Sequence, residues 1–579
     1  MQISRRKMMG WMGGGAGLPF FLSCQNDPVT VPGRTWEHEG FPAPADHAPD
    51  PLTDRVFPMS VCSGDPSETG VILWTRIDPA MCDGLTDLTF QVSQDPGFAT
   101  PLVEGRIPAG LISATSDHTV KVDLDGLLRP LSTYYYRLIY GRVPSRTGRC
   151  RTLPAAGEPL SSLQLAVFSC QDYTNGYYSA FRHVSRQNHI DFVLHLGDFI
   201  YESTGDARFQ NHPFPDRLIR LPSEHTVAMD LDDYRNLYKW YRRDPDLLRA
   251  MEAHTWIMVP DDHETANDCY WDYTDDAPGF PDHPLHKEGD DARHALMRQS
   301  RQAWAEYVPT RQKFDPSTNR AADVLKIYRQ FSFGDLADLF MLDTRTYRSP
   351  HACGVTDVFG RYLPLGCTAY KDEGSTMLGD KQRQWLLEGL YRSTTRWPVL
   401  GNQTWMSQLG LTLDRQNWLP VNIDAWDGYQ TERRLLAGFA REYGMEDLVV
   451  LTGDMHTFMA GLLQVGYGSG PEAGQVIGVE LMTSSVTSQG LIDTVRDTLL
   501  RRGEGRLLSM LSSQLIRRQN PHIRLFDPRN HGYATVRFTE DQLHWTALGF
   551  DKADPRAGAV VLRTLRKRRQ VPELERVRI

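Results

Sequence analysis

Hydrophobic and polar positions alternate along the first part of the chain in short segments bounded by turn residues. The segments with a period of two residues are Val71–Ile77, Leu88–Ser93, His118–Leu124 and Tyr134–Tyr140. This alternation predicts half-buried strands, and no amphipathic helix lies between them. We therefore expect a small β-sandwich domain over residues 55–152.

A tyrosine-rich motif supports the sandwich. The run Leu128-x-Pro130-x-Ser132-x-Tyr134 resembles the corner of fibronectin-type sandwiches, in which a tyrosine hydroxyl binds back to the backbone. A tyrosine-rich edge strand of the following domain would give a similar pattern, so that alternative stays open.

From Ser161 onward the pattern changes to apolar strands separated by helical spacing. Leu163–Phe168 and Asp191–Leu196 are apolar, and Tyr177–Arg186 between them has a helical period. This order predicts a β-α-β unit, and hence an α/β domain with a sheet covered by helices. We assign residues 161–548 to this second domain.

Further apolar segments each end in a cluster of polar residues. They are His254–Pro260 before Asp261-Asp262-His263-Glu264, Asp338–Leu342 before Asp343-Thr344-Arg345, Pro398–Leu400 before Gly401-Asn402-Gln403, and Leu448–Leu451 before Thr452-Gly453-Asp454-Met455-His456. In α/β sheets, ligands bind outside the carboxyl ends of the strands. Several polar clusters at such ends predict one converging site.

The first two strand ends bring in metal-binding residue types. Cys170 closes the first strand, and Gly197 before Asp198 permits a tight turn at the end of the second, with Tyr201 three residues on. Thiolate, phenolate and carboxylate suit a trivalent ion such as Fe(III), whereas carboxylate and amide oxygens suit Ca, Mg or Mn. Taken singly, Cys170 is better explained as a buried small hydrophobe and Tyr201 as a core residue. Their joint placement at strand ends favours a metal site.

Composition narrows the class of protein. The chain has 579 residues, 40% hydrophobic and 23% charged, which is typical of a globular protein with room for at least two domains. Its net charge of -9 argues against nonspecific nucleic-acid binding, which needs clustered positive charge. After the first 24 residues, no apolar run approaches the roughly 18–20 residues needed to cross a bilayer.

The eight cysteines are too few for a disulfide scaffold, and the absence of a CxxC pair excludes a zinc ribbon or a thioredoxin motif. Cys353 and Cys367 lie in a loop with proline and glycine and suit a disulfide in an oxidising compartment. Their spacing alone does not decide it.

The N-terminus has the pattern of an export signal. Arg5-Arg6 precede a short, weakly apolar segment, which predicts a twin-arginine signal over residues 1–24, followed by a linker over residues 25–54. The alternative is the basic start of a buried helix, but four glycines between Gly10 and Gly15 would each weaken it by about 1 kcal/mol relative to Ala. We expect the twin-arginine machinery as a partner and a periplasmic or extracellular location, with Cys24 as a candidate lipid anchor.

The order of motifs resembles the alkaline phosphatase D family over about residues 55–548. The N-terminal part of the resemblance is Phe57-Pro58 through Gly64-Asp65-Pro66, and Val71-Ile72-Leu73-Trp74-Thr75-Arg76. The catalytic part is Ser169-Cys170-Gln171-Asp172, Gly197-Asp198-x-Ile200-Tyr201-Glu202, Asp261-Asp262-His263-Glu264 with Asn267, Asp343-x-Arg345-x-Tyr347-Arg348, Gly453-Asp454-x-His456, Thr483-Ser484-Ser485-Val486-Thr487-Ser488 and Asn520-Pro521-His522.

This resemblance implies a calcineurin-like metallophosphoesterase core of the α/β (α+β) class, with two β-sheets flanked by helices in four layers. It also implies Fe(III) and Ca(II) as cofactors, since two ions together activate water and neutralise charge on phosphoryl oxygens. The residues carried over are Cys170, Asp198, Tyr201 and His456 for iron, with Asp198 bridging, and Asp262, Asn267 and Asp454 for calcium. His263 would protonate the leaving oxygen or stabilise the transition state, and Arg345 would contact the substrate phosphate.

We therefore expect an exported phosphoesterase acting on phosphate monoesters and diesters, with a phospholipid or a teichoic-type polymer among the candidate substrates, and a monomer in solution. A phospholipase D activity on the same fold is one alternative. A noncatalytic surface-binding protein built on the sandwich is another, although such a protein has no reason to keep seven metal-type residues together.

Two segments remain. Residues 265–330 read as a long, irregular insertion that forms either a lid over the site or a solvated loop. Residues 549–579 read as a basic C-terminal tail, in which Arg566-Lys567-Arg568-Arg569 either contact anionic lipid or polyphosphate or belong to a solvated helix or a frayed end.

Overall fold

The computed structural model describes residues 2–3, 36, 40–44, 47–206, 209–210, 213–272, 275–318, 320–353, 361–362, 364, 366–412, 418–468, 471–490, 493 and 504–578. The predicted export signal, apart from Gln2 and Ile3, lies outside the described residues, and so does Cys24. Among the helices in the described ranges, none is long and apolar enough to cross a membrane.

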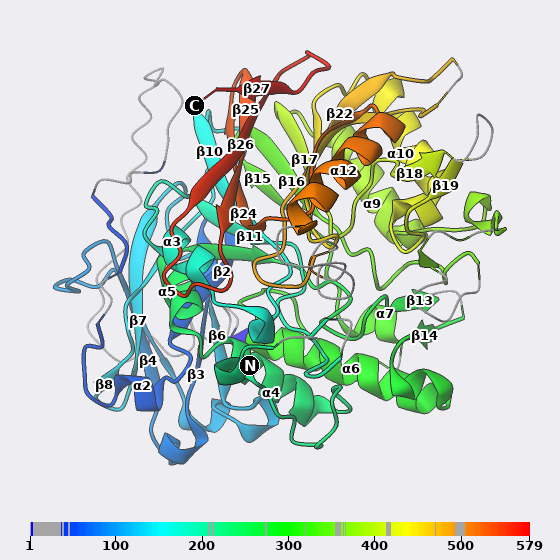
Figure 1. Cartoon of the computed structure of the whole chain (residues 1–579). Coiled ribbons are helices and arrows are strands. Elements are labelled where there is room, and N and C mark those ends of the chain that lie inside the picture. The colour runs from blue at the N-terminus through cyan, green and yellow to red at the C-terminus, as the bar shows by residue number, and fades with distance from the viewer. Residues whose placement is uncertain are drawn as a thin grey trace.

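Two large sheets form the body of the molecule (Figure 1). The first has eleven strands in the order β1 (Gln2–Ile3), β6 (Thr119–Asp123), β3 (Gly70–Arg76), β2 (Val61–Ser67), β12 (Thr255–Met258), β11 (Phe192–His195), β10 (Ser162–Phe168), β24 (His531–Thr539), β25 (Gln542–Phe550), β26 (Val560–Arg568) and β27 (Glu575–Val577). The second has seven strands in the order β15 (Arg329–Phe333), β16 (Ala337–Met341), β17 (Trp397–Gly401), β20 (Leu448–Thr452), β22 (Val476–Met482), β21 (Phe458–Gln464) and β23 (Ile523–Asp527).

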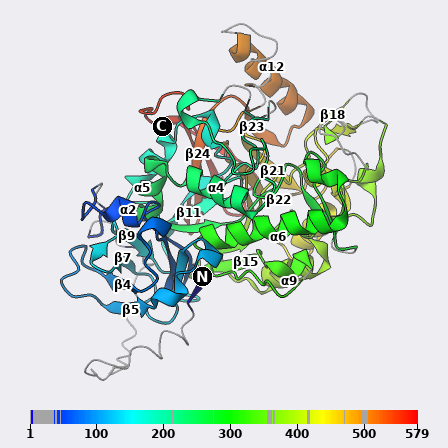
Figure 2. The ribbon, with the colours of Figure 1, turned by 90° about the horizontal axis from the view of Figure 1, so that it is seen from below.

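The helices and the smaller strands surround these sheets (Figure 2). The helices within the described ranges are α2 (Thr53–Val56), α3 (Ser179–Ser185), α4 (Leu231–Tyr241), α5 (Pro245–Ala253), α6 (Asp290–Tyr307), α7 (Ala321–Val324), α9 (Gly379–Arg392), α10 (Gln430–Glu442) and α12 (Glu504–Gln519). Two short hairpins pair β13 (Tyr270–Asp272) with β14 (Ala277–Gly279), and β18 (Gly410–Thr412) with β19 (Trp418–Pro420).

The two sheets pack against each other through one apolar core, as buried side chains of β10, β11, β24 and β25 share a cluster with those of β16, β17, β20 and β22. Trp397 lies in this layer, with its indole nitrogen donating to Thr539 O at 2.8 Å. The outer face of the second sheet packs on α9 and α10 in a separate cluster, and α3 and α5 cover the first sheet. The predicted fold class, two sheets flanked by helices, is confirmed.

Parallel strands occupy the middle of both sheets. β10, β11 and β12 are parallel neighbours, and so are β16, β17, β20 and β22. These include all the strands predicted from apolar segments, with ends within two residues of the prediction. The polar clusters follow the carboxyl ends of these strands and therefore lie in one region of the molecule.

The N-terminal antiparallel β domain is also confirmed. A five-stranded sheet of β5 (Val103–Ile107), β4 (Leu88–Ser93), β7 (Thr133–Tyr140), β8 (Val143–Pro144) and β9 (Gly148–Arg151) packs on β2, β3 and β6 around its own core. The expected tyrosine corner is present, since the backbone nitrogen of Arg129 donates to Tyr134 Oη at 3.0 Å. The domain is not separate, however, because β2 pairs in parallel with β12 and extends the first catalytic sheet.

The insertion after the Asp-Asp-His-Glu cluster is not irregular. It contains α6, eighteen residues long, which buries Leu296, Met297 and Trp304 against the body. The prediction of an irregular loop over residues 265–330 is therefore wrong for this helical part.

The C-terminal residues do not form a tail. β26 pairs along its whole length with β25, and β27 pairs with β26. Lys567 is fully buried and donates to Asp447 Oδ1 at 2.6 Å, whereas Arg566 pairs with Glu575 nearer the surface. The predicted tail over residues 549–579 is corrected to two sheet strands, because the free edge of β25 is covered by backbone pairing.

The disulfide between Cys353 and Cys367 is present. Five other cysteines in the described ranges are free, namely Cys62, Cys82, Cys150, Cys170 and Cys269.

Candidate metal centre

Three overlapping groups of metal-type side chains meet where the parallel strands end. They are Cys170 with Asp198 and His456, Asp198 with Asp262 and His263, and Asp261 with Asp262 and Asp454, and the ligand atoms within each group lie within 4.8 Å of one another. We call Cys170, Asp198, Tyr201 and His456 the cysteine half of the site, and Asp261, Asp262, Asn267 and Asp454 the carboxylate half. Asp198 links the two.

The backbone is strained at the candidate ligands. Cys170, Asp198, Asp454 and His456 all have positive φ, between 52° and 68°. Non-glycine residues seldom adopt this conformation, which costs about 1–3 kcal/mol and concentrates at functional sites. At these four residues, the direction of the side chain is therefore more important than the local stability of the backbone.

Gly197 explains the turn before Asp198. Its φ is 112°, and a Cβ there would lie 2.4 Å from Asp261 Cβ. Only glycine allows the Asp198 turn to approach the Asp261 turn this closely.

Tyr201 and His456 converge on Asp198 in the cysteine half. Tyr201 Oη lies 3.2 Å from Asp198 Oδ2 and 3.1 Å from His456 Nε2. His456 Nδ1 donates to Gln489 O at 2.5 Å, which leaves Nε2 as the ring nitrogen able to bind a metal. Cys170 Sγ completes the group, with Ser169 Oγ 2.7 Å away. The four side chains that the sequence predicted for iron are thus brought together.

The carboxylate half is held by donors from neighbouring loops. Thr404 Oγ1 donates to Asp454 Oδ2 at 2.7 Å, and the backbone nitrogen of Asp268 donates to Asp262 Oδ2 at 2.5 Å. Asn267 Nδ2 donates to Asp282 Oδ2 at 2.6 Å, so only its amide oxygen is left for a cation. Asp261 is an addition, since the sequence analysis placed it in a polar cluster at a strand end but assigned it no ligand role.

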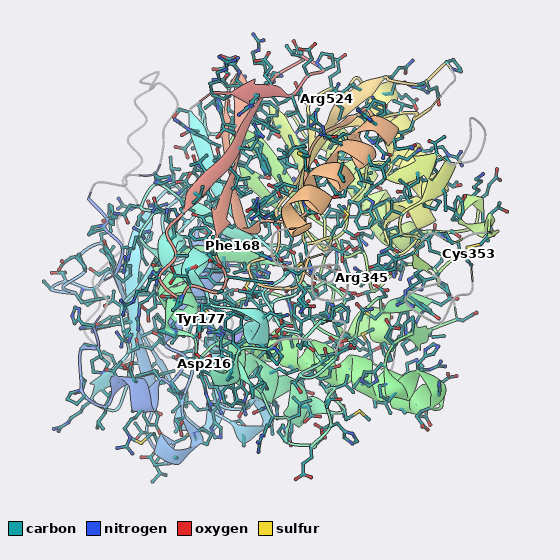
Figure 3. The ribbon with its side chains drawn as sticks, in the orientation of Figure 1. Phe168, Tyr177, Asp216, Arg345, Cys353 and Arg524 are labelled. Carbon is teal, nitrogen blue, oxygen red and sulfur yellow. A yellow bond between two sulfur atoms is a disulfide. The ribbon has the colours of Figure 1, made fainter. Side chains whose placement is uncertain are left out.

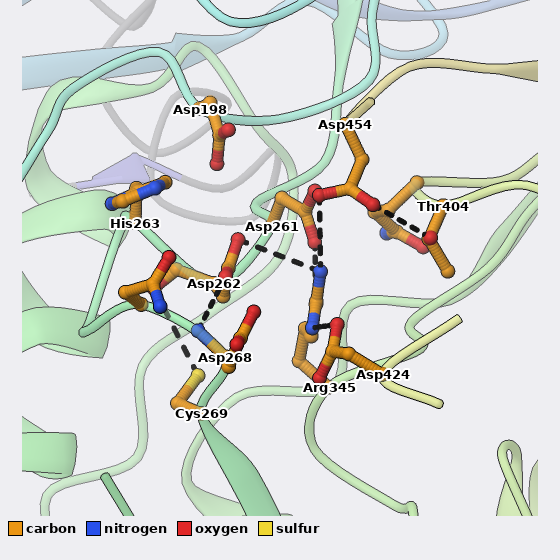
Figure 4. A network of polar contacts seen from close by, with 12 residues as sticks. Asp198, Asp261, Asp262, His263, Asp268, Cys269, Arg345, Thr404, Asp424 and Asp454 are labelled. Atoms are coloured by element: carbon orange, nitrogen blue, oxygen red, sulfur yellow. Dashed lines mark hydrogen bonds and ion pairs between the residues drawn. The ribbon is translucent and has the colours of Figure 1, made fainter. Parts of the chain in front are cut away.

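Arg345 lies among the carboxylates (Figure 4). Its Nε donates to Asp261 Oδ1 at 2.5 Å and its Nη1 to Asp424 Oδ2 at 2.6 Å, while Nη2 lies 3.5 Å from Asp262 Oδ1 and 3.7 Å from Asp454 Oδ1. The side chain is 1% exposed. In this arrangement Arg345 neutralises the carboxylates from within, and its expected contact with the substrate phosphate stays a prediction.

His263 is fixed by a carboxylate and two rings. Its Nδ1 contacts Glu202 Oε2 at 2.6 Å, and its ring lies 4.0 Å from that of Tyr201 and 4.9 Å from that of Phe209. Burial lowers the pKa of His263, but the carboxylates of Glu202, Asp198 and Asp262 outweigh burial and raise it well above the usual value.

The electrostatics of the site fit bound cations. Burial raises the pKa of the Cys170 thiol and of the Asp198 carboxyl well above their usual values, and raises that of Asp454 to about 7. Buried carboxylate oxygens of Asp198 (Oδ1) and Asp261 (Oδ2) have no hydrogen-bond partner, and Asp262 Oδ1 has only the ion pair with Arg345 Nη2 at 3.5 Å. Leaving such groups unpaired is costly, and cations would both satisfy them and displace their protons.

Sequence reasoning missed three carboxylates that organise the site. Glu264 accepts from the backbone nitrogens of Asp198, Phe199 and Asp261, and so fixes two of the turns. Glu202 contacts His263 Nδ1 and accepts a hydrogen bond from the backbone nitrogen of Asn267 at 2.7 Å. Glu202 and Glu264 stand in motifs that follow predicted strands, so their places in the sequence could have identified them. Asp424 follows no predicted strand, and no signal in the sequence pointed to it.

Comparison with known proteins gives matches over most of the chain. The family model "PhoD-like phosphatase" matches residues 165–547, and "PhoD-like phosphatase, N-terminal domain" matches residues 43–154. Alkaline phosphatase D of Bacillus subtilis (strain 168) is 31% identical over 509 residues, which cover 85% of this chain and 76% of that relative. A solved structure titled "Structure of PhoD" is 28% identical, with a TM-score of 0.75 over 90% of this chain and 92% of that one.

Proposed function

Because the chain belongs to the family of PhoD-like phosphatases, we propose that it is an exported, metal-dependent phosphoesterase acting on phosphate monoesters and diesters. The observation that supports this best is the convergence of thiol, phenol, imidazole and carboxyl groups in one buried site with unpartnered carboxylate oxygens.

The two halves of the site suit different ions. Thiolate, phenolate and imidazole in the cysteine half favour Fe(III), held by Cys170, Asp198, Tyr201 and His456. Oxygen donors in the carboxylate half favour Ca(II), held by Asp262, Asn267 and Asp454, with Asp261 beside them. When bound, the ions would supply an activated water and neutralise negative charge on the phosphoryl group.

The protein's own residues supply the proton and the positioning. His263 is held protonated by Glu202 and has Nε2 left to donate a proton to the leaving oxygen. Glu264 keeps the Asp198 and Asp261 turns in register, and Arg345 offsets part of the negative charge of the carboxylate half.

Metal analysis tests the proposal directly. Protein purified from its own host should contain iron, and a chelator such as EGTA should abolish activity while leaving the iron in place, with added Ca(II) restoring it. Protons compete for the carboxylates, so activity should fall as the pH drops.

C170S should lose both iron and the charge-transfer absorption of a thiolate on Fe(III). Full activity and unchanged iron in that variant would remove Cys170 from the ligand set.

The product separates the two esterase alternatives. On a phospholipid, a monoesterase acting on phosphatidic acid releases inorganic phosphate, whereas a phospholipase D acting on a phosphodiester releases phosphatidic acid. Comparing nitrophenyl phosphate, bis-nitrophenyl phosphate, a phospholipid and a teichoic-type polymer would rank the substrate classes. We expect a monomer with no specific nucleic-acid binding.

The proposal of export rests on Arg5 and Arg6. The twin-arginine machinery recognises guanidinium pairs and carries folded proteins, which suits a protein that takes up iron before export. R5K with R6K should leave the precursor in the cytoplasm although the charge is unchanged. Normal periplasmic or extracellular delivery of that double variant would rule out this route, and labelling with a lipid precursor would test Cys24.

A further inference from the structure

Arg361 is a buried cation that the site described above does not use. It lies in sequence between Cys353 and Cys367, the two ends of the disulfide. Its side chain is 0% exposed, and its guanidinium reaches two different carboxylates. Nε donates to Asp268 Oδ2, and Nη2 donates to Asp282 Oδ2 at 2.6 Å.

Asp268 and Asp282 each form a hydrogen bond with a candidate ligand of the carboxylate half. Asp268 donates its backbone nitrogen to Asp262 Oδ2 at 2.5 Å, from a backbone with φ of 52°. Asp282 Oδ2 accepts from Asn267 Nδ2 at 2.6 Å, which turns the amide oxygen of Asn267 away from Asp282. One guanidinium therefore fixes two candidate ligands through one intermediate residue each.

We propose that Arg361 is a positioning residue for the carboxylate half, and that the Cys353–Cys367 disulfide retains it there. The inference rests on the proposed function, since it assigns Arg361 a role in calcium binding. A planar guanidinium can donate to Asp268 and Asp282 at once in fixed directions, which a lysine ammonium on a flexible stem cannot reproduce.

Charge gives Arg361 a second effect. Asp268 and Asp282 lie beside the ligands and would themselves attract a divalent cation if they were unpaired. Pairing both with Arg361 directs a cation to Asp262, Asn267 and Asp454 instead. The burial of Asp268, 6% exposed, makes this neutralisation necessary, because a buried charge without a partner is strongly unfavourable.

The disulfide explains how the arginine stays in place. Cys353 lies toward the edge of the molecule and Arg345 near its centre (Figure 3), so the bridge is remote from the ligands themselves. A cross-link between residues 14 apart in sequence lowers the conformational entropy of the unfolded chain. It therefore favours the folded state, in which Arg361 is inserted.

Calcium titration of the iron-loaded full chain tests the proposal. The rise of the thermal unfolding midpoint with added Ca(II) gives an apparent affinity, and elemental analysis gives the iron content. We expect R361K to weaken calcium affinity by about 10–100-fold, the usual effect of removing a partner of a metal ligand, with iron unchanged. Activity of R361K should recover at saturating Ca(II). C353S with C367S should weaken calcium affinity in the same direction.

R329K is the matched control, since Arg329 also donates through Nε and Nη2 to a buried aspartate, Asp65, at the domain interface. It should lower the unfolding midpoint without changing calcium affinity. Unchanged calcium affinity in R361K, an equal loss in R329K, or loss of iron from R361K would each overturn the positioning role. If the wild-type protein shows no calcium-dependent rise at all, calcium in the proposed function is wrong and this inference fails with it.

Discussion

At the scale of single residues, the charge on His263 is set by its neighbours. A histidine buried alone loses its proton more easily, but Glu202 at 2.6 Å, with the nearby Asp198 and Asp262, raises the pKa of this one well above the usual value. An acid with a raised pKa keeps its proton at higher pH than an ordinary histidine. This allows proton donation to the leaving group to continue under alkaline conditions.

Two variants test this role. H263A should retain its metals but lose roughly 10²–10⁴ in kcat on an unactivated ester, and less on nitrophenyl phosphate, whose leaving group needs little protonation. E202Q removes the charge that raises the pKa, so the alkaline limb of the pH profile of kcat should shift to lower pH. Loss of metal from H263A, or equal losses on both esters, would make His263 a ligand or charge stabiliser instead.

The predictability of the site follows from where its residues stand in the chain. Cys170, Asp198 and Asp454 directly follow apolar strands, so their convergence could be inferred from the common edge of parallel strands. The enclosure of Arg345 could not, because Asp424, which engages it, lies in a loop with no periodic signal. Contacts between loops depend on packing that the hydrophobic pattern does not contain.

At the scale of elements, β26 shows why a charged run need not be exposed. In Arg566-Lys567-Arg568, alternate side chains point to opposite faces of the sheet, so Lys567 is buried against Asp447 while Arg566 and Arg568 pair with Glu575. The prediction from the sequence treated the four positive charges as one run and did not take into account that alternate residues of a strand face opposite sides of the sheet.

K567A should lower the free energy of unfolding by up to about 3–5 kcal/mol, because it removes the buried cation beside Asp447 and leaves only Arg569, 3.5 Å away and partly exposed. R568A, one residue away in the same strand, removes an exposed ion pair and should cost no more than about 1 kcal/mol. Urea denaturation of the two variants compares them directly. Similar losses in both would mean that Lys567 contributes packing of the strand rather than a buried charge pair.

The elements with clear periodicity were predicted well, and α6 was not. The central parallel strands are short, apolar and bounded by polar residues, which is a strong signal. The buried face of α6 includes Ser300 and Arg301 beside Leu296 and Trp304, so its hydrophobic period is interrupted. The helix is stabilised by partners far away in sequence, among them α4.

At the scale of the whole molecule, the sandwich and the catalytic core act as one unit. Besides the shared sheet, Asp65 binds Arg329 at 2.6 Å and Thr310 at 2.7 Å, and Lys121 donates to the backbone oxygen of Ala305 from a buried position. These partners lie about 180 to 260 residues apart in the chain. The sequence predicted an N-terminal β domain ahead of an α/β domain, but it contains no signal for pairing charges over such separations.

Asp117 makes this interface sensitive to pH. It belongs to the sandwich domain and accepts from Arg76 at 2.8 Å, from Lys239 of α4 at 2.8 Å and from the hydroxyl of Tyr307 of α6. Burial alone would raise its pKa, but these partners outweigh burial and lower the pKa from 3.8 to about 2. Since the folded-state pKa is depressed, the stabilisation is present above pH 4 and is lost as the pH falls toward 2.

D117N should therefore be less stable than the wild type at pH 7 by about 2 kcal/mol, the free energy that corresponds to this shift, and the difference should narrow below pH 4. The matched control is D54N, which removes an ion pair with Arg146 in which the Asp54 side chain is 63% exposed, and which should cost at most about 1 kcal/mol at either pH. Urea denaturation at pH 7 and pH 3 measures both. A difference between D117N and the wild type that stays constant from pH 7 to pH 3 would mean that Asp117 holds the two domains together by hydrogen bonding and packing, and that its charge contributes nothing.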